Sequence, residues 1–299
     1  MTAANLLFIT NKRSGTSSYT TFDALVQQVC ADANATYSIA YTKAPRHATE
    51  LAQDGIEKGF SCIVAVGGDG TVNEVASALK GSPVPMAIVP AGSGNGLARH
   101  LGIPLDHKEA MRAIFQSEPR SIDTFTINGR LSLNVSGIGF DAHVATEFGR
   151  DGRRGLASYA RIALREYRQF KTFQATLNLD GGLPVVLDAF VIALANSAQY
   201  GNNARIAPQS SVCDGKLNFV VIKKMPLTRL DLVYALFRGD ITRSASCKTY
   251  EAGKATIQLS RAIPYPVDGE PCAATDTFSV QVHPSSLSLM VPAYRKDSI

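Results

Sequence analysis

The first third of the chain alternates short apolar runs with segments of helical periodicity. In chain order these predict a strand at 6–10, a helix at 19–31, a strand at 37–41, a helix at 44–59 and a strand at 61–66. This alternation is typical of a parallel sheet with crossover helices. A further strand at 86–89 and a short helix at 97–101, stopped by Gly102 and Pro104, complete an α/β domain predicted to end near residue 124.

From about residue 123 the pattern changes to an alternation of period two with hairpin signals. Asn128-Gly129 separates the runs 124–127 and 131–135, and Asp180-Gly-Gly182 separates the runs 175–179 and 184–195. One helix is predicted at 153–171, and later strands are predicted at 216–222, 255–259, 279–283 and 287–291. We therefore expect an α/β domain over 1–124 and a mainly antiparallel β domain over 125–299.

Two glycine-rich loops follow buried strands of the first domain, and each opens a helix. They read Gly67-Gly-Asp-Gly-Thr71 and Pro90-Ala-Gly-Ser-Gly-Asn95. Consecutive N–H groups at a helix N-terminus bind anions, and the helix dipole favours negative charge there. Since adjacent parallel strands bring such loops to the carboxyl edge of the sheet, the pair predicts a phosphate site. Thr71 and Glu74 have the spacing of a capping box, which predicts the helix start at that turn.

A simpler interpretation of the first loop is a tight strand-to-helix turn that needs glycine for its backbone conformation. Asp69 in the middle of that turn has no obvious steric purpose, and a second glycine-rich loop beside it favours a binding site. Neither loop matches the GxxxxGK[ST] pattern of a P-loop or the GxGxxG pattern of dinucleotide-binding proteins.

Composition narrows the function classes less than the motifs do. A chain of 299 residues that is 45% hydrophobic and 18% charged is typical of an ordered protein of about two domains. Its net charge of +5 favours anionic partners such as nucleotides or acidic lipids. Five scattered cysteines without a CxxC pair predict neither a disulfide framework nor a zinc site. No apolar run reaches the roughly 18–20 residues that span a bilayer and the N-terminus lacks a signal-peptide pattern, so a cytoplasmic location is expected.

Several motifs in combination resemble the diacylglycerol kinase catalytic-domain family, which includes bacterial lipid kinases, sphingosine kinases and ceramide kinases. The resemblance covers nearly the whole chain. The segments that carry it are NKRSG at 11–15, GGDGTVNE at 67–74, PAGSGN at 90–95, ANS at 195–197 with IAP at 206–208, DGKL at 214–217 and VDGEP at 267–271. It implies an N-terminal Rossmann-like parallel-sheet domain and a C-terminal mainly antiparallel β-sandwich. The final strand would return to pack on the first domain, and the active site would lie between the domains.

The resemblance also implies an activity: transfer of the γ-phosphoryl group of Mg-ATP to the hydroxyl of a diacylglycerol-like or sphingoid-like membrane lipid. The residues that it places beside the nucleotide are Asn11, Ser14, Gly15, Thr42, Gly67, Gly68, Asp69, Gly70, Thr71, Asn73, Ser93 and Asn95. Asp69 is the candidate ligand of the catalytic Mg²⁺. Glu270 would be the general base, with Asp268 beside it, although Asp268-Gly269 also suits a plain hairpin turn.

A second cation site is implied at Asp214, with backbone carbonyls of Ser211 and Lys216 as further oxygen ligands. As sequence alone, Asp214-Gly215 is more often a turn. Gly96 stands where many bacterial members carry an aspartate, and the segment 92–96 is closer to that of sphingosine and ceramide kinases. The lipid substrate is therefore left open. The alternatives are an NAD kinase-like phosphotransferase and a non-catalytic lipid or nucleotide sensor.

The predicted helix at 153–171 is amphipathic. Its basic face carries Arg154, Arg161, Arg165 and Arg168, and its apolar face carries Leu156, Tyr159, Ala163, Tyr167 and Phe170. A solvated basic face is the simpler interpretation, and contact with the anionic inner face of a membrane is the functional one. No nucleic-acid partner is expected, and a homodimer is left open.

Overall fold

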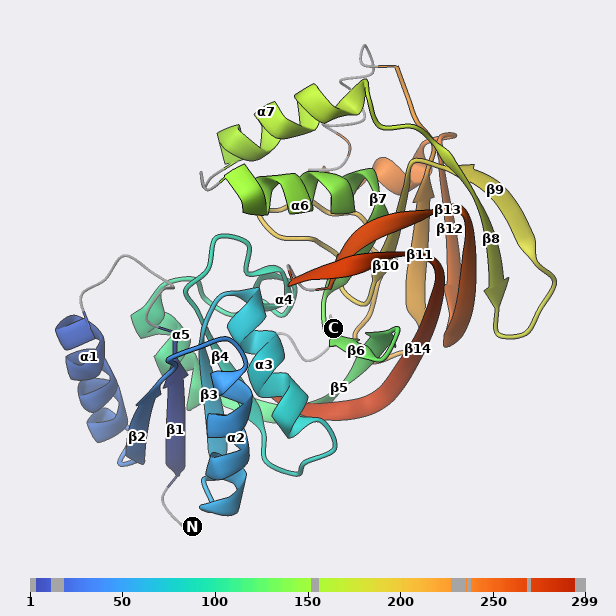
Figure 1. Cartoon of the computed structure of the whole chain (residues 1–299). Helices are drawn as coiled ribbons and strands as arrows, with labels where there is room; N and C mark the ends of the chain where they lie inside the picture. Colours follow the sequence, from blue (N-terminus) through green and yellow to red (C-terminus); the bar gives the residue numbers. More distant parts are fainter. Residues whose placement is uncertain are drawn as a thin grey trace. The chain divides into compact units, whose positions relative to one another are not determined.

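The computed structural model describes residues 4–11, 19–151, 156–226, 235, 238–267 and 270–293 (Figure 1). The chain forms two compact units: unit 1 contains residues 1–123 and 285–299, and unit 2 contains residues 124–284. The chain therefore passes from one unit to the other twice. The assignment of 1–124 to nucleotide binding and of 125–299 to lipid binding stays a prediction.

Unit 1 is built on a parallel sheet with the strand order β2-β1-β3-β4-β14. Its strands are β1 (Asn5–Thr10), β2 (Thr36–Tyr41), β3 (Cys62–Gly67), β4 (Met86–Pro90) and the C-terminal part of β14 (Glu270–Pro292). Phe8 in β1 pairs with Ile39 of β2 on one side and with Val64 of β3 on the other. The strands β3 and β4 are buried throughout, as expected for a parallel sheet covered on both faces. This confirms the predicted Rossmann-like sheet.

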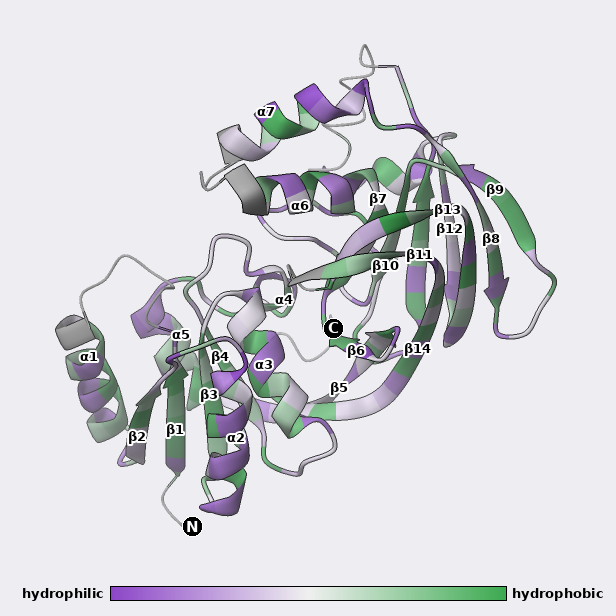
Figure 2. Ribbon diagram, in the orientation of Figure 1, coloured by the Kyte–Doolittle hydropathy of each residue, from purple (hydrophilic) through white to green (hydrophobic). Residues whose placement is uncertain are grey.

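Five helices accompany this sheet in the part of unit 1 that the structure describes. They are α1 (Tyr19–Asp32), α2 (His47–Glu57), α3 (Asp69–Leu79), α4 (Gly96–His100) and α5 (His107–Ile114). Helix α2 packs beside α3, and α1 packs beside α5. Figure 2 shows hydrophilic stretches on the outer side of α2 and apolar strands behind it. Helix α5 was not predicted, although Asp106 marks its start by accepting the N–H of Glu109 at 3.0 Å.

Unit 2 contains two antiparallel sheets. One has the order β12-β11-β10-β7, formed by β7 (Val135–Gly139), β10 (Val191–Ala195), β11 (Leu217–Ile222) and β12 (Cys247–Ala252). The other joins the N-terminal part of β14 to β13 (Lys254–Val267), β8 (Phe173–Leu179) and β9 (Val185–Ala189). Strand β5 (Ser117–Ile127) begins in unit 1 and ends in unit 2, where it forms a short hairpin with β6 (Arg130–Ser132) that turns at Asn128-Gly129, as predicted.

Alternate residues of β10 face two different cores. Ile192 and Leu194 lie in a core with Phe173 and Phe278 of the other sheet. Ala193 belongs to a second cluster on the outer face, with residues such as Ile206 and Val220. The first core joins the facing sides of the two sheets, which confirms the predicted β-sandwich.

Several predicted elements of unit 2 differ from the structure. The run 184–195 is two strands in different sheets, because the chain breaks at Phe190, whose N–H donates to Ile222 and whose carbonyl accepts from Phe140. The predicted strands 279–283 and 287–291 are parts of β14, while β12 was missed. The predicted strand at 131–135 covers the last two residues of β6 and only the first residue of β7.

The sequence predicts one helix at 153–171. The structure has a shorter helix in that region and a second helix before it. Helix α6 (Phe140–Asp151) was missed, and α7 spans Leu156–Tyr167. Gly139, with a φ of 109°, makes the abrupt turn from β7 into α6. The sequence before Gly139 has the pattern of a strand, so the helix that follows was not predicted. Helix α6 packs on β13 and β7, and α7 packs on α6. Among the described residues, no helix combines the length and the apolar character that crossing a membrane requires.

Candidate phosphate site of unit 1

The carboxyl ends of the parallel strands meet at one edge of the unit 1 sheet. Gly67 ends β3 and Pro90 ends β4, and the two residues are register partners. Asn11 follows β1, and its N–H donates to the carbonyl of Val66 at 3.2 Å. Thr42 follows β2, and its N–H donates to Thr10 at 3.0 Å. The structure thus brings Asn11, Thr42 and both glycine-rich loops to one edge. The predicted residues Ser14 and Gly15 lie outside the described residues.

The two glycine-rich loops touch through their backbones. A Cβ atom added at Gly92 would lie 2.5 Å from the Cα of Gly68, and one added at Gly68 would lie 3.2 Å from the Cα of Gly92. In addition, the N–H of Ala91 donates to the carbonyl of Gly67 at 2.8 Å. Position 92 therefore requires glycine because the two backbones approach each other closely there. This requirement holds whether or not the loop binds a ligand.

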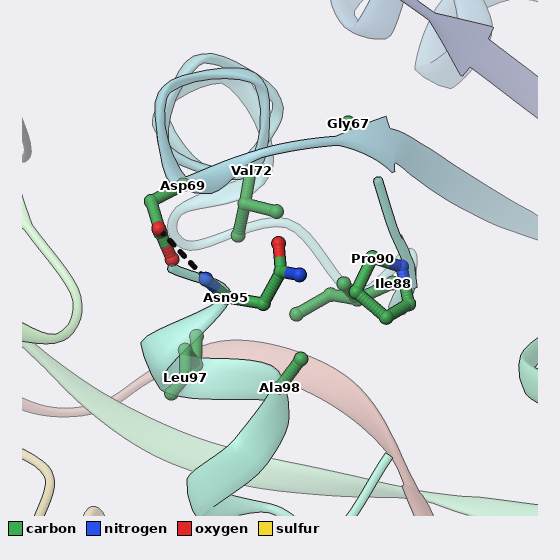
Figure 3. Close-up of a pocket in the computed structure, with 8 residues that line it drawn as sticks. All are labelled: Gly67, Asp69, Val72, Ile88, Pro90, Asn95, Leu97 and Ala98. Carbon is green, nitrogen blue, oxygen red and sulfur yellow. Dashed lines mark hydrogen bonds between the residues drawn. The ribbon is translucent and has the colours of Figure 1, made fainter. Parts of the chain in front are cut away.

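Asp69 joins the first loop to the second. Its Oδ2 accepts the N–H of Asn95 at 3.1 Å (Figure 3), and its Oδ1 accepts the N–H of Gly96 at 3.0 Å. Burial raises the pKa of Asp69, while these amides and the positive charge of Arg99 act in the opposite direction. The carboxylate therefore caps the N-terminus of α4, which explains an aspartate at the centre of this turn.

Asn95 closes the second loop. It has left-handed backbone angles, φ 52° and ψ 45°, and its side chain is buried. Its Oδ1 accepts the N–H of Gly92 at 3.0 Å, and its Nδ2 donates to the carbonyl of Gly92 at 2.8 Å. Ser93, between these residues, is exposed. The side chain of Asn95 thus shapes the loop, and Ser93 is accessible to a ligand.

The predicted capping box at Thr71 and Glu74 is wrong. Helix α3 begins at Asp69, with the N–H of Val72 donating to the carbonyl of Gly68 at 3.1 Å, and its N-cap residue is Gly68, which has no side chain. Thr71 and Glu74 already lie inside the helix. Thr71 accepts a hydrogen bond from the Asn11 side chain at 3.4 Å. The Glu74 carboxylate accepts the N–H of Ala48 at 3.1 Å, at the start of α2.

Two further predicted residues, Gly70 and Asn73, lie on α3. Gly70 is exposed, and a Cβ added there would have no neighbour within 4 Å. Asn73 accepts the Ser77 hydroxyl at its carbonyl, at 2.8 Å. A pocket of about 10 Å³ lies between the loops and is lined by residues including Gly67, Asp69 and Asn95. Figure 3 shows these lining residues. The pocket has room for about one water molecule, so a nucleotide would have to lie over the loops and not inside this pocket.

Arg99 is a residue of this site that the sequence interpretation missed. It lies on α4, and its Nε donates to the carbonyl of Gly94 at 3.1 Å, inside the second loop. Its charge also acts on Asp69. The available signal was a basic residue one helical turn after a glycine-rich loop, where it adds positive charge to the N–H groups.

The residues predicted in unit 2 are described only in part. Glu270 begins β14, where it pairs with Val267, but its side chain and Asp268 lie outside the description. Asp214 Oδ1 accepts the N–H of Lys216 at 2.9 Å, which is the geometry of a turn. The Ser211 hydroxyl accepts the N–H of Cys213 at 3.1 Å.

Within the described residues, no group of three or more His, Cys, Asp or Glu side chains is arranged to hold a metal ion. The implied cation site at Asp214 would depend on backbone carbonyls and water, which suit hard cations. That site stays a prediction.

Comparison with known proteins agrees with the two units. Residues 5–127 match the family model described as diacylglycerol kinase catalytic domain, and residues 134–291 match the YegS C-terminal NAD kinase beta sandwich-like domain. A protein of Pseudomonas putida named "Probable lipid kinase YegS-like" is 30% identical over 82% of this chain and 82% of its own length. A protein of Bacillus subtilis named "Diacylglycerol kinase" is 27% identical over 88% of both chains.

The fold is also that of a solved structure. The crystal structure of a diacylglycerol kinase from Bacillus anthracis superimposes with a TM-score of 0.79 over 98% of this chain and 99% of that one, at 22% identity. The family matches cover both units, and the relatives cover most of the chain. This chain belongs to the diacylglycerol kinase catalytic-domain family of lipid kinases, with a C-terminal domain of the YegS type.

Proposed function

We propose that this chain is an ATP-dependent lipid kinase that transfers the γ-phosphoryl group of Mg-ATP to a lipid hydroxyl of the diacylglycerol or sphingoid type. The observation that carries the proposal is the contact between two glycine-rich loops at the N-terminus of α3. The N-terminus of α3 follows β3 directly and lies at the same sheet edge as Asn11 and Thr42. Such a terminus binds anions through its N–H groups and its dipole.

Asp69 fits the role of a ligand for Mg²⁺. This ion keeps several waters and is usually held by one or two carboxylates together with substrate phosphates. Each Asp69 oxygen accepts one amide of the second loop, which leaves room on the carboxylate for a further contact. Bound Mg²⁺ would neutralise negative charge that builds up on the phosphates. Arg99 adds a fixed positive charge beside it.

Glu270 is the proposed general base, with Asp268 beside it. In the transfer, the lipid hydroxyl oxygen forms a bond to the γ-phosphorus while the bond to the ADP oxygen breaks, and ADP leaves with that electron pair. The hydroxyl proton passes to the Glu270 carboxylate. Because the transition state is loose, positioning and charge neutralisation contribute more than this base. We propose that the reaction takes place in the cytoplasm at the inner face of the membrane.

A kinase assay with radiolabelled ATP and Mg²⁺ tests the proposal. The acceptors are diacylglycerol, phosphatidylglycerol, sphingosine, ceramide and undecaprenol in mixed micelles. We expect labelling of at least one lipid, and a loss of about a hundredfold or more in Glu270→Gln and Asp69→Asn. Asp54→Asn, at an exposed position of unit 1, is the matched control with full activity.

Calorimetry with Mg-ATP separates binding from chemistry. Glu270→Gln should bind the nucleotide as the unmodified protein does, whereas Asp69→Asn should bind it more weakly. Full labelling in both variants, or no heat with Mg-ATP in the unmodified protein, would refute the proposed roles.

A further inference from the structure

Strands β13 and β14 form a hairpin whose end carries Glu270, the proposed general base. This end consists of three register pairs between residues 265–267 and 270–272, which we call the tip of the hairpin. Two register shifts, which lie between Gln258 and Tyr265 on β13, separate the tip from the regular part of the hairpin. Irregularities of this kind, such as β-bulges, are frequent next to active sites, where they redirect a side chain.

The backbone ladder of the tip lacks donors at its centre. The middle pair joins Pro266 to Pro271, and neither residue has a backbone N–H. Pro264, which precedes the tip, lacks this donor as well. Because proline cannot donate to a ladder, the end of this hairpin needs other contacts to keep one position. Side chains have to supply these contacts.

Tyr265 supplies such contacts at the first pair of the tip. It is 5% exposed, and its ring packs edge-on against Phe278 of β14 at a centroid distance of 5.0 Å. Its hydroxyl accepts the Nδ2–H of Asn128 at 3.3 Å. Burial raises the pKa of Tyr265, and so does a side-chain hydrogen bond with Cys272, its register partner, whereas the bond from Asn128 lowers it. The neutral hydroxyl therefore connects the β5–β6 turn to the strand that carries Glu270.

Asn128 is itself fixed in the β5–β6 turn. Its backbone has a φ of 49°, which asparagine adopts more readily than most residues. Its N–H donates to the carbonyl of Ser279 at 2.9 Å, and its Oδ1 accepts the N–H of Ser279 at 2.7 Å. Its Nδ2 also donates to the carbonyl of Thr277 at 3.2 Å. Asn128 thus binds the regular part of β14 directly and the tip through Tyr265.

We infer that Tyr265, held by Asn128, is a positioning residue for Glu270, because its ring and hydroxyl keep the hairpin tip in one place. The inference rests on the proposed function, which assigns the lipid proton to Glu270. A tyrosine that only fills the core needs its ring there, whereas a buried hydroxyl also needs partners. Small displacements of a base slow proton transfer, because the base must stay within hydrogen-bond reach of the proton. The effect should therefore appear in kcat and not in nucleotide binding.

Tyr265→Phe removes the hydroxyl and keeps the ring. In the assay with radiolabelled ATP, we expect kcat for the best lipid acceptor to fall about tenfold, with KM for ATP unchanged. In the Glu270→Gln background the same substitution should cause no further loss, because the group that it positions is already inactive. Losses that multiply in the double variant would overturn the inference, since Tyr265 would then act independently of Glu270.

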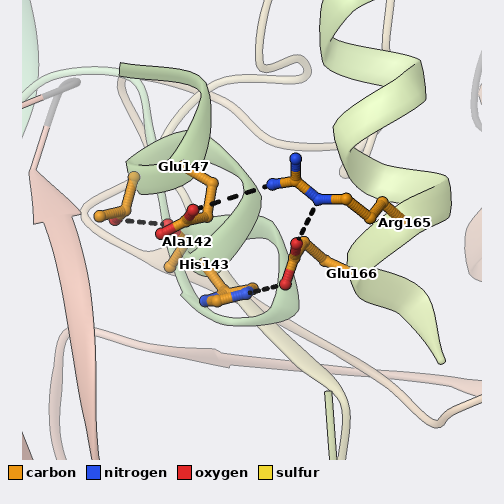
Figure 4. A network of polar contacts seen from close by, with 6 residues as sticks. Ala142, His143, Glu147, Arg165 and Glu166 are labelled. Carbon is orange, nitrogen blue, oxygen red and sulfur yellow. Dashed lines mark hydrogen bonds and ion pairs between the residues drawn. The ribbon is translucent and has the colours of Figure 1, made fainter. Parts of the chain in front are cut away.

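Tyr167→Phe is the matched control, since it removes a hydrogen-bonded hydroxyl elsewhere in unit 2. That hydroxyl accepts the N–H of Met225 at 3.1 Å. Helix α7, which carries Tyr167, has a second attachment to α6, because His143 Nε2 lies 2.9 Å from Glu166 Oε2 (Figure 4). We expect kcat to be unchanged in this variant. An equal loss of kcat in both variants would overturn the inference, because a general loosening of unit 2 would then be the cause.

Hydrogen exchange tests the anchor without a kinase assay. In Tyr265→Phe the amides of the tip should exchange about fivefold faster, while those of Thr256 and Ile257, in the regular part of β13, should not change. Unchanged exchange at the tip would overturn the inference, whatever the kinetic result. If the unmodified protein labelled no lipid, the proposed function would be refuted, and hydrogen exchange would still decide whether Tyr265 anchors the tip.

Discussion

At the scale of single residues, Asp141 is a carboxyl group whose ionisation is opposed by its surroundings. It lies in the first turn of α6, where its Oδ2 accepts the Tyr200 hydroxyl at 2.6 Å and its Oδ1 accepts the N–H of Ala142 at 2.8 Å. A Cβ at Gly137 would lie 1.8 Å from Oδ2, so this glycine makes the space for the carboxyl group. Burial raises the pKa of Asp141 from 3.8 to about 6, against the two hydrogen bonds.

This pKa predicts a dependence of stability on pH. Because the folded state holds the Asp141 proton more tightly than the unfolded state does, the contribution of this group falls as the pH rises from about 4 to about 6. The free energy of unfolding should lose about 3 kcal/mol over that range relative to Asp141→Asn, and the difference should be constant at higher pH. Urea denaturation of both proteins at several pH values measures it.

Tyr200→Phe is the companion variant. It removes a hydrogen bond that lowers the pKa of Asp141, so the decline should extend to higher pH than in the unmodified protein. A flat difference between the unmodified protein and Asp141→Asn across the whole range would contradict this account of the buried carboxyl group.

At the scale of elements, a residue of α3 caps the N-terminus of α2. The N-terminus of α2 lacks a cap from its own sequence, since Arg46 precedes it with a φ of 66° and no side-chain hydrogen bond. Glu74 of α3 supplies that cap by accepting the N–H of Ala48, and its carbonyl accepts the Thr49 hydroxyl at 2.8 Å. These two hydrogen bonds connect α3, which begins at the proposed phosphate site, to α2.

Removing this cap should destabilise unit 1. Glu74→Ala should lower the free energy of unfolding by about 1 kcal/mol, the usual cost of a lost helix cap. Glu74→Gln keeps an acceptor oxygen and should recover most of that loss. Glu57→Ala, at an exposed position of α2, is the control with little change. If Gln were as costly as Ala in urea denaturation, the hydrogen bond to Ala48 would not be the cause.

At the scale of the whole molecule, the last strand of the chain belongs to both units. The N-terminal part of β14 pairs with β13 in unit 2, and residues from 285 onward lie in unit 1. There Leu289 pairs in parallel with Met86 of β4, and its side chain is 0% exposed. The core of unit 1 is therefore completed by residues almost 200 positions after its other strands.

Leu289→Ala should thus destabilise unit 1 although it lies near the C-terminus. We expect a loss of about 2–5 kcal/mol in the free energy of unfolding, with faster hydrogen exchange at the β4 amides. Leu183→Ala removes the same atoms at a position that is 92% exposed and should change stability by less than about 0.5 kcal/mol. Equal effects of the two substitutions would show that Leu289 does not complete this core.

Local patterns were enough to predict much of this protein. The strands and helices from residue 5 to residue 101 follow from periodicity and from glycine and proline signals, because each depends on neighbours within a few residues. The two glycine-rich loops were identified for the same reason, since the backbone conformations that glycine permits are local. Helix α6, the break at Phe190 and strand β12 were missed, because their patterns are set by which sheet each segment joins.

By itself the sequence determined the order of elements from β1 to α4 of unit 1, the two-domain class and the place of the two glycine-rich loops. Only the tertiary structure decided the partners: Asp69 with the amides of α4, Glu74 with α2, and Leu289 with β4. The physical reason is distance along the chain. Propensity and turn chemistry act between near neighbours, whereas a hydrogen bond or a buried contact across 26 residues or more exists only after the segments have packed.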